Sequence, residues 1–303
     1  PIYSTKMKNE ITEPLAEEAL KLDSTYAEAY AILSLAKLFK WMDVPTKNNP
    51  ELRNQQFDDT NKANFLAKTA LQYDKDNLLA HAMINIIPFF NMDSDSETNN
   101  LFIVRSMLID AKMFLQKFPD ALLSKYIYAL ILTEKIKLQG GEKEDYQEPL
   151  DYLLDIYHKL KRNNFVISHP TDGMVMNMWA DIARLYYRIG DAEKGMDFII
   201  ENKHYICPNG TYECLNVDLH SYMMKGFYGA YYYENALELI NIILSKSEEE
   251  LIAVGNTIDD KKTAYYKSGM IYMKLGQFDK AIEGFSQALK LSYDDDEINI
   301  WWN

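Results

Sequence analysis

Small and bulky apolar residues recur at helical spacing near the C-terminus of the chain. A small residue flanked by aromatic ones is followed by a turn and then by a small–bulky–small stripe: Tyr265, Gly269, Tyr272, Gly276, Gln277, Ala281, Phe285 and Ala288. Apolar residues three or four positions apart predict one buried face of a helix, so the pattern predicts two helices joined by a turn. Because one such pair cannot bury its own apolar face, it predicts further helix pairs stacked on it.

The same pattern recurs upstream. A second clear copy has Trp179, Ala183, Tyr186 and Gly190 in the first helix and turn, and residues 191–200 as the second helix, with Gly195 where alanine is usual. Looser copies cover residues 19–34, 70–83, 114–129 and 227–243. The clearest repeats are therefore residues 262–295 and 176–204. We predict an all-α fold in which residues 1–303 form a single right-handed α-solenoid of about six antiparallel helix pairs.

Two segments depart from the repeat. Residues 42–58 form a polar, proline-containing insertion that is longer than a turn between helices requires, with the next helix expected near Asp59. Gly140-Gly141 marks a second joint, before a helix whose first turn accommodates Pro149. Both are expected to be excursions from one continuous superhelix.

The two ends leave two interpretations open. Residues 7–22 have the pattern of a second helix with no first helix before it, and Ile300-Trp301-Trp302 resembles the start of another first helix. The chain is then a segment excised from a longer protein. Alternatively, Trp301 and Trp302 pack on the last repeat as a cap, since terminal repeats are atypical.

Net charge and hydropathy restrict the kinds of partner that the chain is expected to bind. The chain has 32 Lys and Arg against 45 Asp and Glu, a net charge of -13, which opposes binding to nucleic acid or anionic lipid. A neutral or basic protein partner is expected. Since no stretch approaches the length of a membrane span, no direct insertion into a membrane is expected.

The repeat pattern resembles that of tetratricopeptide-repeat proteins, from about residue 15 to residue 303 and most closely in residues 265–291. The resemblance implies a superhelix whose first helices line a concave groove that binds peptides. By helical phase, it places these residues in the groove: Phe39, Phe90, Tyr126, Arg184, Tyr187, Arg188, Lys225, Tyr228, Tyr266, Met270 and Met273. The Lys and Asn clamp of some chaperone-binding members is not reproduced, because the corresponding faces carry Ala180 with Arg184 and Tyr266 with Met270.

The resulting functional hypothesis is a protein–protein interaction scaffold that binds a peptide or partner segment on its concave face. One alternative is a sensory or regulatory module of a larger signalling or transcription protein. Another is a surface or periplasmic accessory protein that handles glycans, suggested by the 22 tyrosines and the cysteine pair.

The candidate chemistry is sparse. Cys207 and Cys214 enclose a turn, and either form a disulfide in an oxidising compartment or remain two thiols in the cytoplasm, so the sequence leaves the localisation open. The histidines lack metal-ligand spacing, and His81, at an aromatic position of a first helix, is expected to pack rather than to bind a metal. We expect no metal site, no cofactor and no enzymatic activity, because no phosphate-binding loop or nucleophile–base pair is present.

Overall fold

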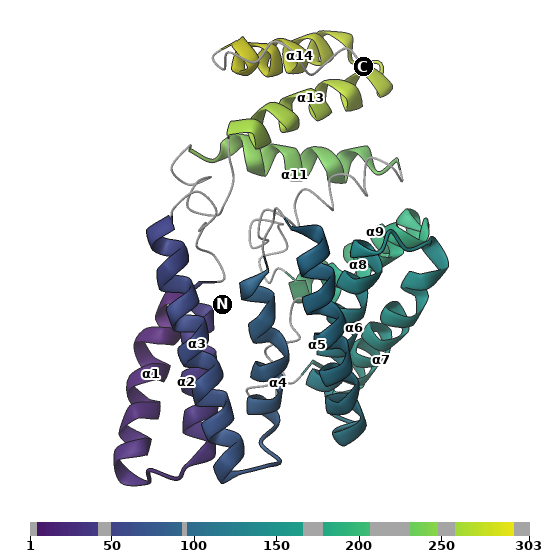
Figure 1. Cartoon of the computed structure of the whole chain (residues 1–303). Coiled ribbons are helices and arrows are strands. Elements are labelled where there is room, and N and C mark those ends of the chain that lie inside the picture. The colour runs from purple at the N-terminus through teal and green to yellow at the C-terminus, as the bar shows by residue number, and fades with distance from the viewer. Residues whose placement is uncertain are drawn as a thin grey trace. The chain divides into compact units, whose positions relative to one another are not determined.

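The computed structural model describes residues 5–41, 50–92, 96–165, 178–206, 231–247 and 258–293. These residues form helices joined by turns, with no strand among them (Figure 1). The all-α prediction is therefore confirmed for this part of the chain. Contacts divide the chain into two compact units, Pro1–Leu185 and Tyr186–Asn303, and each is described by itself.

The first unit contains α-helices that pack in chain order, with α1 against α2, α2 against α3, α5 against α6 and α6 against α7 (Figure 1). Its elements are α1 (Thr5–Leu22), α2 (Ala27–Phe39), α3 (Pro50–Tyr73), α4 (Leu78–Ile86), η1 (Ile87–Asn91), α5 (Glu97–Lys117), α6 (Leu122–Leu138), η2 (Lys143–Tyr146) and α7 (Gln147–Arg162). Helix α8 (Met178–Ile189) spans the boundary between the units. The second unit continues with α9 (Ala192–Ile206), α11 (Tyr233–Ser245), α13 (Ile258–Lys274) and α14 (Phe278–Tyr293).

The start of α3 differs from the prediction. The sequence placed the helix after the insertion near Asp59, but α3 begins at Pro50, so the last nine residues of the predicted insertion 42–58 are helical. Proline is favoured in the first turn of a helix because the missing N–H has no intrahelical partner there. Pro50 therefore starts a helix in a segment that the polar pattern marked as irregular.

One turn geometry recurs three times in the first unit. In each case the residue directly after the first of two helices donates its N–H to the carbonyl four residues before it. Its own carbonyl accepts a hydrogen bond from the N–H three residues after it. The N···O distances of these two hydrogen bonds are 2.8 and 3.2 Å at Asp23, 2.8 and 3.2 Å at Asp74, and 3.0 and 3.2 Å at Phe118. The recurrence identifies α1–α2, α3–α4 and α5–α6 as equivalent segments of a repeat.

Aromatic residues link these segments. Tyr30, seven residues after Asp23, donates its hydroxyl to the Ser24 carbonyl at 3.0 Å and stacks on Tyr73 with ring centroids 5.7 Å apart. His81, seven residues after Asp74, takes the equivalent place: Nε2 lies 2.9 Å from the Lys75 carbonyl oxygen, and its ring centroid lies 5.5 Å from that of Phe118. The packing role predicted for His81 is confirmed.

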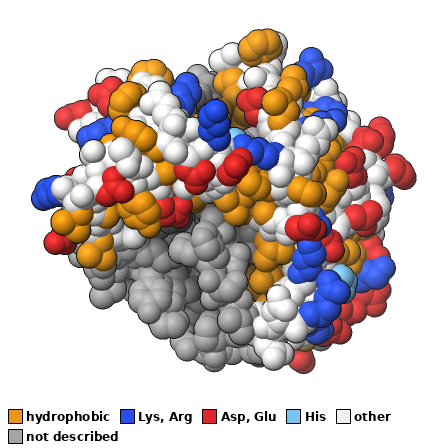
Figure 2. Space-filling view, turned by 90° about the horizontal axis from the view of Figure 1, so that it is seen from below, with side chains coloured by type: hydrophobic (Ala, Val, Ile, Leu, Met, Phe, Trp, Pro, Cys, Tyr) orange, Lys and Arg blue, Asp and Glu red, His pale blue; other side chains and the backbone are white. Residues whose placement is uncertain are grey.

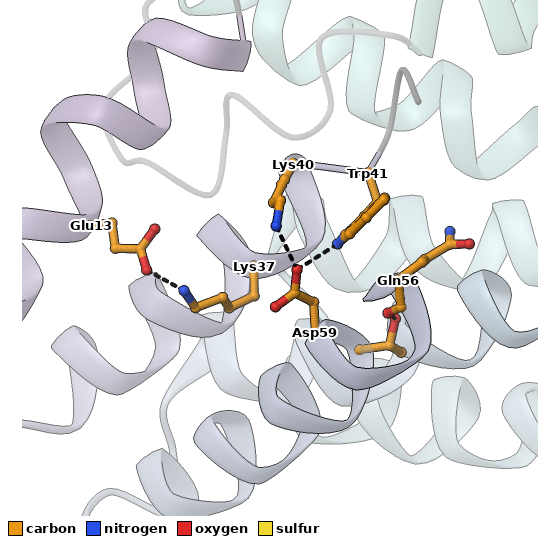
Figure 3. Close-up of polar contacts among 7 residues, drawn as sticks. Glu13, Lys37, Lys40, Trp41, Gln56 and Asp59 are labelled. Carbon is orange, nitrogen blue, oxygen red and sulfur yellow. Dashed lines mark hydrogen bonds and ion pairs between the residues drawn. The ribbon is translucent and has the colours of Figure 1, made fainter. Parts of the chain in front are cut away.

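Polar contacts fasten the C-terminal end of α2 to its neighbours (Figure 3). Asp59 of α3 accepts hydrogen bonds from Lys40 Nζ at 3.0 Å and from Trp41 Nε1 at 2.9 Å on the same oxygen, Oδ2. One turn earlier, Lys37 forms an ion pair with Glu13 of α1. Trp41, two residues after the end of α2, is thus buried with its indole N–H satisfied.

In the second unit, α13 and α14 cross at two glycines. A Cβ placed on Gly284 would lie 2.9 Å from Gly269 N, 2.9 Å from Ser268 Oγ and 3.0 Å from the Tyr265 carbonyl oxygen. A Cβ on Gly269 would lie 2.8 Å from the Phe285 ring. The small residues of the sequence pattern therefore mark a helix contact too close for a methyl group.

We predict that Gly284→Ala destabilises the α13–α14 pair by about 1–3 kcal/mol, because overpacking outweighs the better helix propensity of alanine. Urea denaturation followed by circular dichroism measures the change. Ser286→Ala, on an exposed position of the same helix, serves as the control and should shift stability by no more than about 0.5 kcal/mol. Equal effects of the two substitutions would contradict the close contact.

Candidate functional site

Helix α8 carries three of the predicted groove residues on consecutive turns. Arg184 is partly buried, with a side chain that is 31% exposed, and its Nη1 donates a 2.9 Å hydrogen bond to Asp181 Oδ1. Tyr187 is 42% exposed, and Arg188 is half-buried in the last turn. An ion pair within α8 thus fixes the Arg184 guanidinium, while the Tyr187 side chain is partly exposed to solvent.

Tyr126 lies beneath this surface rather than on it. The residue is 7% exposed, and its hydroxyl donates a 2.9 Å hydrogen bond to Asp181 Oδ2. One carboxylate therefore joins Tyr126 of α6 to Arg184 of α8. Sequence reasoning missed Asp181, although its position three residues before Arg184 on a predicted helix is the spacing of an intrahelical ion pair.

Burial dominates the electrostatics of this cluster. The pKa of Asp181 is raised because burial penalises the carboxylate, and the nearby Arg184 and the Tyr126 hydroxyl only partly offset that effect. The pKa of Tyr126 is raised well above its usual value, first by burial and then by the charge of Asp181. The cluster fixes the orientation of Arg184, and the Tyr126 hydroxyl stays protonated.

Helix α13 presents the second described part of the predicted surface. Tyr266, Met270 and Met273 follow one another at i, i+4 and i+7, and therefore share a face of the helix. Tyr266 and Met270 are half-buried, and Met273 is 43% exposed. The Tyr266 ring packs against Phe285 of α14 with centroids 5.7 Å apart, so the second helix of the pair supports this face.

The remaining predicted residues are placed less fully. Phe90 is half-buried in η1. Phe39 is the last residue of α2, but its side chain lies outside the described part of the structure, as do Lys225, Tyr228, Cys207 and Cys214. The candidate disulfide and the groove positions of Phe39, Lys225 and Tyr228 therefore stay predictions.

A shallow, open basic pocket that the sequence reasoning did not single out lies at the C-terminal end of α7. It has a volume of about 410 Å³, and its described lining consists of His158, Lys161 and Arg162. The sequence does contain an indication of this pocket, because basic residues cluster in the last turn of the helix, where cations are favoured by the helix dipole. Nearby, Lys161 Nζ lies 3.1 Å from the Tyr157 hydroxyl oxygen.

Charge is mixed on the face of the molecule shown in Figure 2. Hydrophobic, basic and acidic side chains alternate there, so the net negative charge does not form one continuous acidic face in that view. Within the described residues, no three His, Cys, Asp or Glu side chains come together as a metal site. The described helices include none with the length and hydropathy of a bilayer span.

Comparison with known proteins identifies the second unit's last helix pair. Residues 263–292 match the family model of the tetratricopeptide repeat. The resemblance predicted from Gly269, Ala281 and Phe285 is confirmed over this stretch, which lies inside α13 and α14. A repeat of this family is generally a surface for protein–protein interaction rather than a catalytic unit. No curated protein matches the chain.

We predict that Tyr126→Phe lowers the free energy of unfolding by about 1–2 kcal/mol, because the buried Asp181 carboxylate loses a hydrogen-bond donor. Chemical denaturation of the wild type and the variant measures this change in the free energy of unfolding. Tyr187→Phe, which removes the same hydroxyl from a ring that is 42% exposed, is the matched control and should be nearly neutral. A neutral effect of Tyr126→Phe would show that this hydrogen bond contributes nothing to stability.

The raised pKa of Asp181 also predicts a pH dependence. The folded protein binds this proton more tightly than the unfolded chain, so the contribution of Asp181 is fully present below its unfolded pKa. It declines as the pH rises through the higher folded pKa. The stability of the wild type relative to Asp181→Asn should therefore increase as the pH is lowered from about 7 to about 4. An opposite trend would show that Arg184 outweighs burial.

Proposed function

We propose that this chain is a protein-interaction scaffold that binds an extended or helical peptide on the faces of its first helices, in the concave groove of a right-handed superhelix. The observation that carries the proposal is the tetratricopeptide repeat at residues 263–292, whose first helix, α13, carries the half-buried Tyr266 and Met270 and the exposed Met273 on one face. The second helix, α14, approaches α13 closely at Gly269 and Gly284 and supports Tyr266 through Phe285.

The side chains on this surface of the first helices have properties suited to binding a peptide. Met270 and Met273 offer adaptable apolar contacts, because methionine side chains are unbranched and polarisable. On α8, Tyr187 adds a rigid amphipathic ring, and Arg184 supplies a guanidinium whose direction is set by Asp181. An apolar surface with a few oriented polar groups is the usual composition of a peptide-binding groove.

The charge of the chain selects among peptides. With a net charge of -13, the molecule as a whole attracts basic segments, admits neutral ones and repels acidic ones at long range. Arg184 and Arg188 are local exceptions on α8, and they would bind a backbone carbonyl or a single carboxylate of an otherwise neutral or basic peptide.

The test starts from a displayed random-peptide library selected on the immobilised 303-residue chain. Fluorescence anisotropy then gives the affinity of a selected, labelled peptide for the wild type and for variants. We predict that Met270→Ala with Met273→Ala weakens binding about 10-fold, as expected for truncation of central apolar contacts.

The matched control is Leu15→Ala with Leu22→Ala, which truncates two exposed apolar side chains on α1, a second helix. This control should leave the affinity unchanged, and circular dichroism should show equal helix content in all variants. Selection of no peptide, or equal weakening by both double substitutions, would refute the proposed binding face.

A further inference from the structure

Three charged side chains meet where α6 packs against α7. Lys125, in the first turn of α6, donates a hydrogen bond from Nζ to Asp155 Oδ2 of α7 and forms an ion pair with it. Lys159, one turn after Asp155 on α7, has its Nζ 4.0 Å from the same oxygen. Two ammonium groups therefore share a single carboxylate oxygen.

Partial burial limits the screening of this cluster by water. The side chains of Lys125 and Lys159 are 15% and 28% exposed, against 43% for Asp155. Two further charges act on the cluster: the exposed Asp120, just before α6, and Arg162, three residues after Lys159. They are one of each sign, so the cluster still has more cations than anions. Cations held close together in a partly dehydrated site destabilise each other's charge.

Lys159 is the member of the cluster that holds its proton least tightly. The hydrogen bond from Lys125 lowers the pKa of Asp155, so its carboxylate is charged. Burial alone would lower the pKa of Lys125, but its contacts with Asp155 outweigh burial and the pKa is raised. The pKa of Lys159 is lowered, first by burial and then by Lys125, and the Asp155 carboxylate only partly offsets these effects.

We propose that Lys159 is a nucleophilic lysine and that it is acylated by thioesters. A partly dehydrated lysine beside a second cation is an arrangement that favours the neutral, nucleophilic amine. Lys159 Nζ attacks the carbonyl carbon of the thioester, the N–C bond forms, the C–S bond breaks, and the thiolate leaves with the bonding electrons. The amine loses one proton, which passes to the thiolate or to water.

An amide is the product that lasts at this position. A Schiff base with an aldehyde would be open to hydrolysis because Lys159 is 28% exposed, whereas an amide persists in water. Acylation also removes the charge of Lys159. The product therefore keeps the ion pair between Lys125 and Asp155 and loses the repulsion between the two ammonium groups. The site involves none of the residues of the proposed peptide surface on α8 and α13.

Labelling of the full chain with N,S-diacetylcysteamine, a neutral acetyl thioester, tests the proposal. Mass spectrometry of the digested protein gives the rate of acetylation at each lysine, with Lys68, exposed on α3, as the reference. At about pH 7.5, Lys159 should be acetylated at least about 3-fold faster than Lys68, although it is the less exposed of the two. A rate equal to or below that of Lys68 would overturn the proposal, because partial burial without activation slows the reaction.

Two substitutions of Lys125 separate the effect of charge from that of packing. Lys125→Met removes the neighbouring cation and leaves Asp155 to Lys159, so it should lower the rate at Lys159 at least about 3-fold. Lys125→Arg, the matched control, keeps the cation and should retain the wild-type rate. Equal rates at Lys159 in the two variants would overturn the proposal. Circular dichroism and an unchanged rate at Lys68 confirm that the fold is retained.

The pH dependence distinguishes the charge of Lys125 from a change in exposure. In the wild type, the rate at Lys159 should reach its plateau at a lower pH than in Lys125→Met, because the wild-type amine loses its proton more readily. If the two profiles differ only by a constant factor, Lys125 acts through exposure alone and the proposal is wrong.

Discussion

The structure depends on a contact between two helices whose backbones lie too close together to admit a Cβ atom between them. At the crossing of α13 and α14, Gly284 faces the backbone of Gly269, and a methyl group on either residue would meet a neighbour at less than 3.0 Å. Because Gly269 has no side chain, the Phe285 ring packs directly over it and also reaches the Tyr266 ring, with centroids 5.7 Å apart. The close approach thus determines which face of α13 stays open.

The first unit uses alanine and serine for the same purpose. Ala63, Ala67 and Ala70 of α3 are fully buried, and Ser34 of α2 donates a 2.8 Å hydrogen bond to the Ala63 carbonyl oxygen. Small side chains allow close approach, and the recurring turns at Asp23, Asp74 and Phe118 repeat the same local geometry. Tyr30 and His81 then connect each segment to the next, which explains why no helix pair needs a large core of its own.

Much of the fold was predictable because it follows from local periodicity. The spacing of Gly269, Ala281, Phe285 and Ala288 predicted the helix pair that the structure contains. The start of α3 at Pro50 was missed because the polar residues after it resemble a loop, although a proline is itself favoured in the first turn of a helix. Helical phase likewise could not show that Tyr126 is buried, because its partner Asp181 lies 55 residues away in the sequence.

The most direct test of this account is hydrogen–deuterium exchange of the chain with and without a selected peptide, read out by mass spectrometry. If the second helices support a binding surface formed by the first helices, the peptide should slow exchange in α8 and α13 and leave α9 and α14 unchanged. Slower exchange in α14, α3 or α5, with α13 unaffected, would contradict the account, because the bound peptide would then lie on the second helices.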